Sequence, residues 1–223
     1  KYTARGNLVA VVSNGTAVLG LGNIGPLASK PVMEGKGVLF KKFAGVDVFD
    51  IEIAENDPDK IVDIVASLEP TFGGINLEDI KAPECFYIER KLRERMNIPV
   101  FHDDQHGTAV VILAGLLNAV KVTKKQLDTI RVVVNGLGAA GITCCQILLN
   151  AGVRHITGCG RQGIILSESS EQLLAHRDRL TALVNRERAK GSLQDALKGA
   201  DVFIGLSSAN LLKPTDLNLM ASD

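Results

Sequence analysis

The sequence predicts an α/β protein with parallel sheets, arranged as two consecutive domains. Short apolar runs that are typical of buried strands alternate along the chain with longer runs of helical periodicity. Two glycine-rich turns, at residues 20–25 and 136–141, each stand directly before a predicted helix. Because a nearly continuous apolar helix follows Gln105, we expect the boundary there, between residues 1–104 and 105–223.

Composition narrows the classes of partner. The chain has 223 residues, 46% of them apolar, and equal numbers of basic and acidic side chains, 25 of each. This balance predicts no attraction to nucleic acid or to a membrane surface. The apolar runs are shorter than the ~20 residues that a spanning helix needs, and no signal peptide opens the chain. The four cysteines form no CxxC pair, so we expect a reduced, cytoplasmic setting.

The first elements are read from turn residues and periodicity. Apolar runs at residues 7–13 and 16–21 flank Asn14-Gly15, a pair typical of tight hairpin turns, so we predict a β-hairpin here. The glycine-rich turn at 20–25 then opens a helix that reaches about Phe43. Alternating apolar residues predict a strand at 46–53.

The rest of the first domain follows the same logic. Asp57-Pro58 is typical of a helix start, and apolar residues up to Leu68 fall on one face of that helix. Residues 73–76 read as a loop before two acidic residues. A helix at about 83–96 and a short strand at 98–101 lead to an acidic loop.

The second domain begins with the apolar helix at 108–120, and Thr123 with Gln126 reads as a capping box for a further helix. A β-branched strand, a glycine turn and a helix then open a doubly wound sheet. The predicted elements after the apolar helix are strands at 130–134, 154–157 and 201–205 and helices at 142–150 and 193–198.

The glycine turn of the second domain has the GxGxxG pattern of dinucleotide-binding loops. Gly136 permits the tight turn, Gly138 lets the backbone approach a pyrophosphate, and Gly141 lets the helix pack on the strand. Ala139 and Ala140 complete the loop at the start of the helix, where free N–H groups favour phosphate. A plain strand–helix turn is the alternative interpretation of the same residues.

The end of the next strand bears on cofactor choice. NAD enzymes usually carry an acidic residue about 20 residues after the glycine loop. Here the sequence has Gly160 followed by Arg161, and Arg161 could pair with a 2′-phosphate. We therefore expect NADP as the cofactor, with NAD possible. Alternatively, Arg161 is a solvated loop residue.

Two acidic pairs stand apart in the sequence, Glu78-Asp79 after the predicted loop at residues 73–76 and Asp103-Asp104 after the predicted strand at 98–101. Adjacent buried carboxylates repel one another and need a counter-ion, which Mg²⁺ or Mn²⁺ could supply through oxygen ligands. Two separate solvated turns are the alternative. His102 and His106 flank the second pair, but they lack a zinc motif and are interpreted either as neighbours that support the metal ligands or as structural residues.

Five motifs in this order resemble those of bacterial malic enzymes. They are Gly20-Leu-Gly-Asn-Ile-Gly25, Lys30-Pro-Val-Met-Glu-Gly-Lys36, Thr71-Phe-Gly-Gly-Ile-Asn-Leu-Glu-Asp79, Phe101-His-Asp-Asp-Gln-His-Gly-Thr108 and Asn135-Gly-Leu-Gly-Ala-Ala-Gly141.

The resemblance implies oxidative decarboxylation of malate to pyruvate and CO₂ with reduction of NAD(P). It makes Glu78, Asp79 and Asp104 the ligands of Mg²⁺ or Mn²⁺, Lys36 the catalytic lysine and Asp103 its carboxylate partner. Sequence logic alone would not choose Lys36 over Lys30 or Lys41.

The resemblance also assigns the two domains. Residues 1–104 would be the catalytic, metal- and malate-binding domain, and residues 105–223 a truncated NAD(P)-binding Rossmann domain. We expect a fragment, incomplete at both ends, because the family's catalytic tyrosine has no match at Tyr2 or Tyr87. The family also implies a homodimer. Rival interpretations are an inactive or regulatory nucleotide-binding fragment and a metal-independent amino-acid or folate dehydrogenase.

Overall fold

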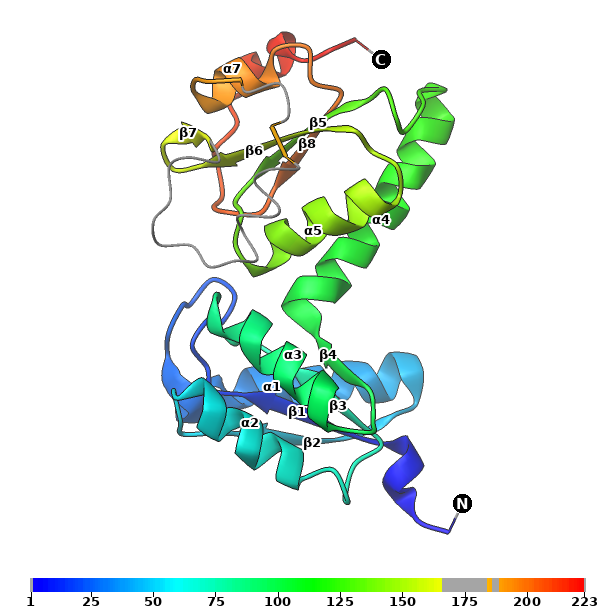
Figure 1. Ribbon diagram of the computed structural model, residues 1–223, viewed down its shortest axis with the longest axis vertical. Helices are drawn as coiled ribbons and strands as arrows, with labels where there is room; N and C mark the ends of the chain where they lie inside the picture. Colours follow the sequence, from blue (N-terminus) through cyan, green and yellow to red (C-terminus); the bar gives the residue numbers. More distant parts are fainter. Residues whose placement is uncertain (1, 166–183, 186–188, 223) are drawn as a thin grey trace. The chain divides into compact units, whose positions relative to one another are not determined.

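The computed structural model describes residues 2–165, 184–185 and 189–222. The chain divides into two compact units, Lys1–Asp104 and Gln105–Asp223. Each unit contains a four-stranded sheet with helices packed against it (Figure 1). The expected α/β class with parallel sheets is confirmed.

The sheet of the first unit is fully parallel, in the order β2-β1-β3-β4. Helix α1 connects the first two strands and packs on them, and α2 and α3 pack on each other over the opposite face (Figure 1). This division follows from right-handed crossovers that run in opposite directions from β1. The strands are β1 (Leu8–Ser13), β2 (Asp47–Glu52), β3 (Gly74–Leu77) and β4 (Val100–His102), preceded by the short 3-10 helix η1 (Ala4–Asn7).

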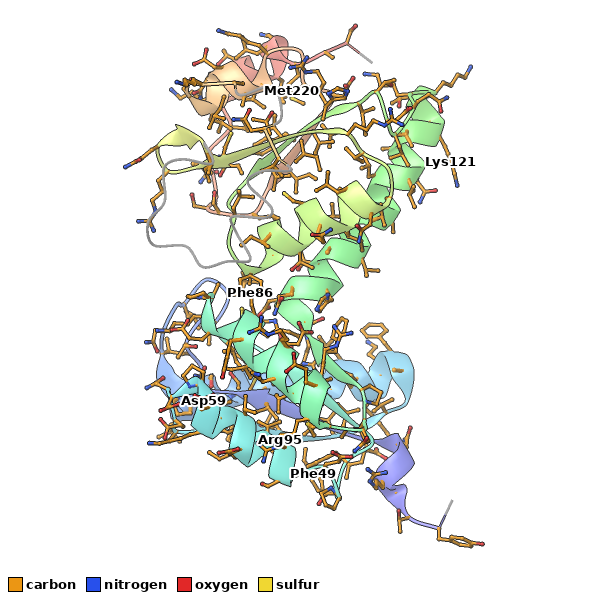
Figure 2. All side chains as sticks on the ribbon, in the orientation of Figure 1. Phe49, Asp59, Phe86, Arg95, Lys121 and Met220 are labelled. Carbon is orange, nitrogen blue, oxygen red and sulfur yellow. The ribbon has the colours of Figure 1, made fainter. Side chains whose placement is uncertain are left out.

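The helices of this unit begin and end where their sequences predict. Helix α1 (Gly25–Ala44) stops at Gly45, whose left-handed backbone ends the helix. Asp57 caps α2 (Pro58–Ser67) by accepting hydrogen bonds from two backbone N–H groups. Side-chain pairs then link α2 to α3 (Glu84–Arg95), as Figure 2 shows around Asp59 and Arg95.

The two faces of this sheet differ chemically. Side chains alternate between the faces, and parallel register places neighbours in adjacent strands on the same face. Ala10, Val12, Ile75 and Leu77 are buried on the α2 and α3 side and form an apolar core. The α1 side instead carries polar residues toward the carboxyl ends of the strands. They are Ser13, Asp50, Glu52, Asn76, Glu78 and Asp103.

The predicted hairpin at residues 7–21 is wrong. Strand β1 already has a parallel neighbour on each side, β2 and β3, so no edge is left for a hairpin partner. The Asn14-Gly15 turn instead directs the chain toward α1. Gly15 has φ +65°, and a Cβ there would lie 2.2 Å from the Gly25 carbonyl oxygen. Val18 and Gly22 form only an isolated bridge.

Two predicted loops are elements of regular structure. Residues 74–77 form β3, a buried central strand, because the sheet supplies partners on both sides. The acidic loop at Asp103-Asp104 is the first turn of α4 (Asp103–Thr123), where carboxylates favour the positive end of the helix. The capping box expected at Thr123 opens no helix, since its hydroxyl donates back to the Ala119 carbonyl.

The second unit has the sheet order β7-β6-β5-β8, with β5, β6 and β8 parallel and β7 antiparallel. Helices α4 and α5 pack against the face that carries Val132 and Val134, and α7 packs near Val133 on the other face. The elements are β5 (Arg131–Asn135), α5 (Ala139–Asn150), β6 (His155–Gly160), β7 (Gly163–Ile164), α7 (Leu193–Leu197), β8 (Val202–Gly205) and the 3-10 helix η2 (Pro214–Leu219).

Helix α4 is longer than the apolar run that predicted it. Its 21 residues and mean hydropathy of 1.4 over its most apolar window would allow it to cross a membrane by length and composition alone. One such helix among the described residues is weak grounds for a membrane span, because core helices meet the same criterion. Leu116 is buried, and Ile112 and Val120 pack against the core of the second unit.

Candidate metal centre and nucleotide pocket

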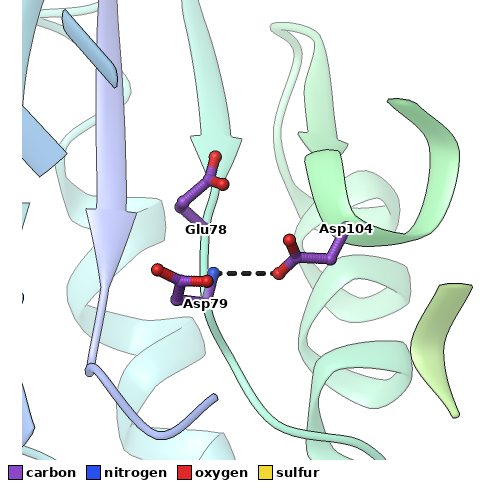
Figure 3. Close-up of side chains that lie close together, drawn as sticks. All are labelled: Glu78, Asp79 and Asp104. Carbon is purple, nitrogen blue, oxygen red and sulfur yellow. Dashed lines mark hydrogen bonds between the residues drawn. The ribbon is translucent and has the colours of Figure 1, made fainter. Parts of the chain in front are cut away.

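Three carboxylates converge at the carboxyl end of the first sheet. Glu78, Asp79 and Asp104 each offer an oxygen, and these atoms lie within 4.8 Å of one another (Figure 3). Parallel pairing brings them together, because β3 and β4 are neighbours and end at the same edge. The backbone N–H of Asp79 donates to Asp104 Oδ2 at 3.0 Å, which holds the segment after β3 to the first turn of α4. Among the described residues, this is the cluster of ligand groups that could hold a metal ion.

The electrostatics of the cluster favour a bound cation. Desolvation raises the pKa of Glu78 to about 7, although Lys36 opposes the shift. Desolvation and the Asp104 charge raise the pKa of Asp79 to about 6. The pKa of Asp104 is also raised, chiefly by burial, while His102 opposes this effect. A divalent cation with carboxylate ligands would relieve this repulsion, so the donor set fits Mg²⁺ or Mn²⁺.

Lys36 reaches the cluster from α1. Its Nζ lies 3.2 Å from Glu78 Oε1 and 3.1 Å from Glu78 Oε2, and it donates to Asp103 Oδ2. Burial lowers the pKa of Lys36, but the hydrogen bond to Asp103 and the Glu78 charge outweigh burial and leave it raised. The amine therefore connects the carboxylate cluster to Asp103.

The other two candidate lysines of α1 lie elsewhere. Lys30 pairs with Asp50 at 2.5 Å and with Glu52 at 3.1 Å, both on β2. Lys41 pairs with Asp47 at 2.7 Å. The structure thus shows which of the three lysines lies beside the carboxylate cluster, a choice that the sequence alone did not allow. It rests on helix phase, because Lys30 and Lys41 lie on the side of α1 that faces β2, whereas Lys36 faces Glu78 and Asp103 at the ends of β3 and β4.

The histidines flanking the acidic pair are outside the carboxylate cluster. His102 is completely buried in β4, and its backbone N–H donates to Glu89 Oε1 of α3 at 3.1 Å. Its position on the α3 side follows from strand alternation. His106 belongs to the second unit.

The second unit contains a pocket of about 720 Å³ at the carboxyl ends of its parallel strands. This is where open α/β sheets bind ligands. Two residues of the predicted cofactor set, Gly136 and Arg161, line it. Residues outside that predicted set line it as well, and they come from the ends of the strands and the start of α7. They include Asn135, Leu137, Gly160, Gln162, Ser192, Gln194, Ser207 and Ser208.

The glycine loop has the backbone that its pattern predicts. Gly136 has φ +102°, and a Cβ there would lie 2.8 Å from the Leu206 backbone. A Cβ on Gly141 would lie 1.9 Å from the Gly136 carbonyl oxygen, so glycine is needed for helix and strand to meet. Gly138 has open space around it and forms the N-cap of α5, which begins with Ala139 and Ala140.

Sequence comparison identifies both halves. Residues 2–93 match the malic enzyme N-terminal domain, and residues 105–212 match the malic enzyme NAD-binding domain. The chain belongs to the malic enzyme family. It is 58% identical to an NADP-dependent malic enzyme of Haemophilus influenzae over 224 residues and 56% identical to an NAD-dependent malic enzyme of Geobacillus stearothermophilus. The resemblance inferred from the five motifs is confirmed.

Solved structures agree with this assignment. The NAD-dependent malic enzyme of Thermotoga maritima is 53% identical, with a TM-score of 0.94 over 99% of this chain. The malic enzyme of Pyrococcus horikoshii is 50% identical, also with a TM-score of 0.94. The chain spans 29% of the Haemophilus enzyme, 46% of the Geobacillus enzyme and 59% of the Thermotoga chain. The Rossmann-type fold expected for the second half is confirmed.

Proposed function

We propose that the protein to which this chain belongs oxidises and decarboxylates malate to pyruvate and CO₂, with reduction of NAD(P). The observation that carries the proposal is the contact of Lys36 with both Glu78 and Asp103, beside the Asp79 and Asp104 carboxylates. A domain of the malic enzyme nucleotide-binding type follows it in the chain. Neither rival dehydrogenase class has a use for three clustered carboxylates.

Glu78, Asp79 and Asp104 would hold Mg²⁺ or Mn²⁺. When bound, such a cation supplies positive charge that stabilises negative charge developing on substrate oxygens. The rest of the chemistry belongs to the protein and NAD(P). A bound NAD(P) would supply the acceptor for the hydride of malate C2, and Lys36 Nζ takes the C2 hydroxyl proton. The C3–C4 bond then breaks, CO₂ leaves, and the electron pair remains as an enolate that takes a proton at C3.

Lys36 must be neutral to accept the hydroxyl proton. Its raised pKa in this structure depends on Asp103 and on Glu78. A cation bound to Glu78 would partly neutralise its charge and would therefore lower the pKa of Lys36. Asp103 accepts the Lys36 hydrogen bond and so provides a path by which the amine can pass its proton on.

The test is malate-dependent NAD(P)H formation by the full protein with Mn²⁺, Mg²⁺ or EDTA. Turnover should require the metal, and carbon dioxide should form in equal amount to NAD(P)H. Unchanged turnover in EDTA would contradict the metal centre. NAD(P)H formation from an amino acid but not from malate would favour the rival dehydrogenase, and no turnover would favour the inactive fragment.

For the cofactor we propose NADP rather than NAD. Arg161 lines the nucleotide pocket directly after Gly160, and the end of β6 offers no acidic side chain. Relatives of both specificities are similarly close, so the family does not decide. The kcat/KM for NADP should exceed that for NAD, and Arg161→Ser should narrow the difference by about tenfold, the value of one charge-assisted contact. A wild-type preference for NAD would contradict this assignment.

We further propose a cytoplasmic homodimer. Four free, buried cysteines support a reducing compartment, and family likeness supports the dimer. Light scattering of the full protein would measure its mass in solution, and the mass of a monomer would contradict the proposed homodimer.

A further inference from the structure

Asn76 is a buried polar residue in the middle of a parallel sheet. Its relative exposure is 3%, and it lies in β3 between Val11 of β1 and Phe101 of β4. Asparagine is depleted in strands, and a buried amide without a partner destabilises the fold. An apolar side chain would suit this position better if only packing mattered.

The amide of Asn76 has a specific partner. Its Nδ2 donates to Glu78 Oε2 at 2.9 Å, and both side chains lie on the α1 side of the sheet because they are two residues apart. Lys36 also contacts this carboxylate. Lys36 reaches Glu78 through a long flexible side chain, whereas Asn76 is fixed by the strand. Asn76 is therefore the more rigid constraint on the Glu78 carboxylate.

We propose that Asn76 is a positioning residue, which orients Glu78 so that its carboxylate can serve Lys36 and a divalent cation together. The inference rests on the proposed metal centre. A carboxylate has about four lone-pair directions, and the Asn76 hydrogen bond occupies one of them. This restricts rotation of the carboxylate and leaves its other lone pairs for Lys36 and for a cation shared with Asp79 and Asp104.

The experiment measures Mn²⁺ binding by electron paramagnetic resonance of the free ion, in the full protein without substrate. Asn76→Ala should weaken Mn²⁺ binding by about tenfold or more, the usual effect of removing a partner of a metal ligand. Asn76→Leu, which keeps the branching and the number of heavy atoms of the side chain but removes the donor, should have the same effect. In a Glu78→Gln background, Asn76→Ala should change the affinity by less than about threefold, because interactions within one network are not additive.

Ser29→Ala is the matched control. Ser29 is completely buried in the same unit and donates to the Pro26 carbonyl oxygen rather than to the carboxylate cluster. It should leave Mn²⁺ affinity unchanged, and circular dichroism in EDTA should show every variant folded.

Each contrary result has its own meaning. Wild-type affinity in Asn76→Ala would overturn the positioning role and leave the metal centre intact. An equal loss in the wild-type and Glu78→Gln backgrounds, or unfolding of both Asn76 variants, would make Asn76 a structural residue and overturn the role as well. Failure of the wild type to bind Mn²⁺ would overturn the metal centre and this inference together.

Discussion

At the scale of single residues, Asp104 allows the effect of its negative charge to be tested separately from the effect of its hydrogen bond. Its Oδ2 accepts the Asp79 N–H, and an asparagine could preserve this bond through its own oxygen while removing the negative charge. Asp104→Asn should therefore leave the contact between the segment after β3 and the first turn of α4 in place, and should weaken Mn²⁺ binding by more than about tenfold.

Titration of Mn²⁺ by calorimetry checks this expectation. Asp63→Asn is the control, because Asp63 pairs with Arg95 on the surface and lies outside the carboxylate cluster. Equal affinities of the wild type and Asp104→Asn would remove Asp104 from the metal centre.

Lys36 can be tested against another lysine of the same helix. Lys36→Ala should lower kcat for malate oxidation by about 10²–10⁴-fold, since a general base typically contributes that much. Mn²⁺ and NAD(P) binding should persist, and steady-state kinetics with separate binding measurements would show the split.

Lys42, rather than Lys30, is the suitable control. Lys30→Ala would leave Asp50 and Glu52 without their counter-ion, so it would perturb the sheet. The described contact of Lys42 is with the Phe43 ring, and Lys42→Ala should keep most of the activity. Equal losses in Lys36→Ala and Lys42→Ala would show that Lys36 has no special role.

At the scale of elements, the glycines of the β5–α5 turn have different roles, one in packing and one in cofactor binding. Gly141→Ala should destabilise the second unit by several kcal/mol, because the added Cβ would overlap the Gly136 carbonyl oxygen. Gly138→Ala has space and should fold normally, yet weaken NAD(P) binding, because the methyl group would stand where a phosphate approaches the helix.

Thermal unfolding and fluorescence titration of NAD(P)H distinguish the two effects. A folded Gly141→Ala variant with wild-type stability would contradict the packing argument. Wild-type cofactor affinity in Gly138→Ala would instead indicate that the pyrophosphate does not approach this loop.

At the scale of the whole molecule, the buried carboxylates couple stability to pH and metal. Glu78 and Asp79 have folded pKa values of about 7 and about 6, above their ordinary values of 4.5 and 3.8. Between about pH 4 and 7 the folded state therefore binds more protons than the unfolded state. Proton binding thus favours the folded state at low pH, and the free energy of unfolding falls as pH rises through this window. In EDTA, these groups should lower the free energy of unfolding on the order of a few kcal/mol over that window.

Excess Mn²⁺ should reverse the loss at pH 8, by about 2.7 kcal/mol when its concentration is a hundred times Kd. Urea unfolding at several pH values, with and without metal, measures both effects. Glu78→Gln is the control and should flatten the decline in EDTA. A wild-type stability that rises between pH 5 and 8 in EDTA, with no difference from Glu78→Gln, would contradict the raised pKa of Glu78.

Local rules predicted much of the structure correctly. The Asp57 cap, the α3 helix and the strand before the glycine loop depend on neighbouring residues, and the structure contains them. Strand pairing was not predictable in the same way. The Asn14-Gly15 pair favours a hairpin locally, but β1 is occupied on both edges by strands that come later in the chain.

The sequence by itself determined the α/β class, the malic enzyme family and the glycine loop, because motif order and periodicity are properties of the chain alone. Only the tertiary structure decided which lysine of α1 meets Glu78, that Asn76 holds this carboxylate, and that Asp79 and Asp104 share a hydrogen bond. Those contacts depend on sheet register and on the phase of α1. Both are fixed by packing between distant segments, so local preferences do not contain them.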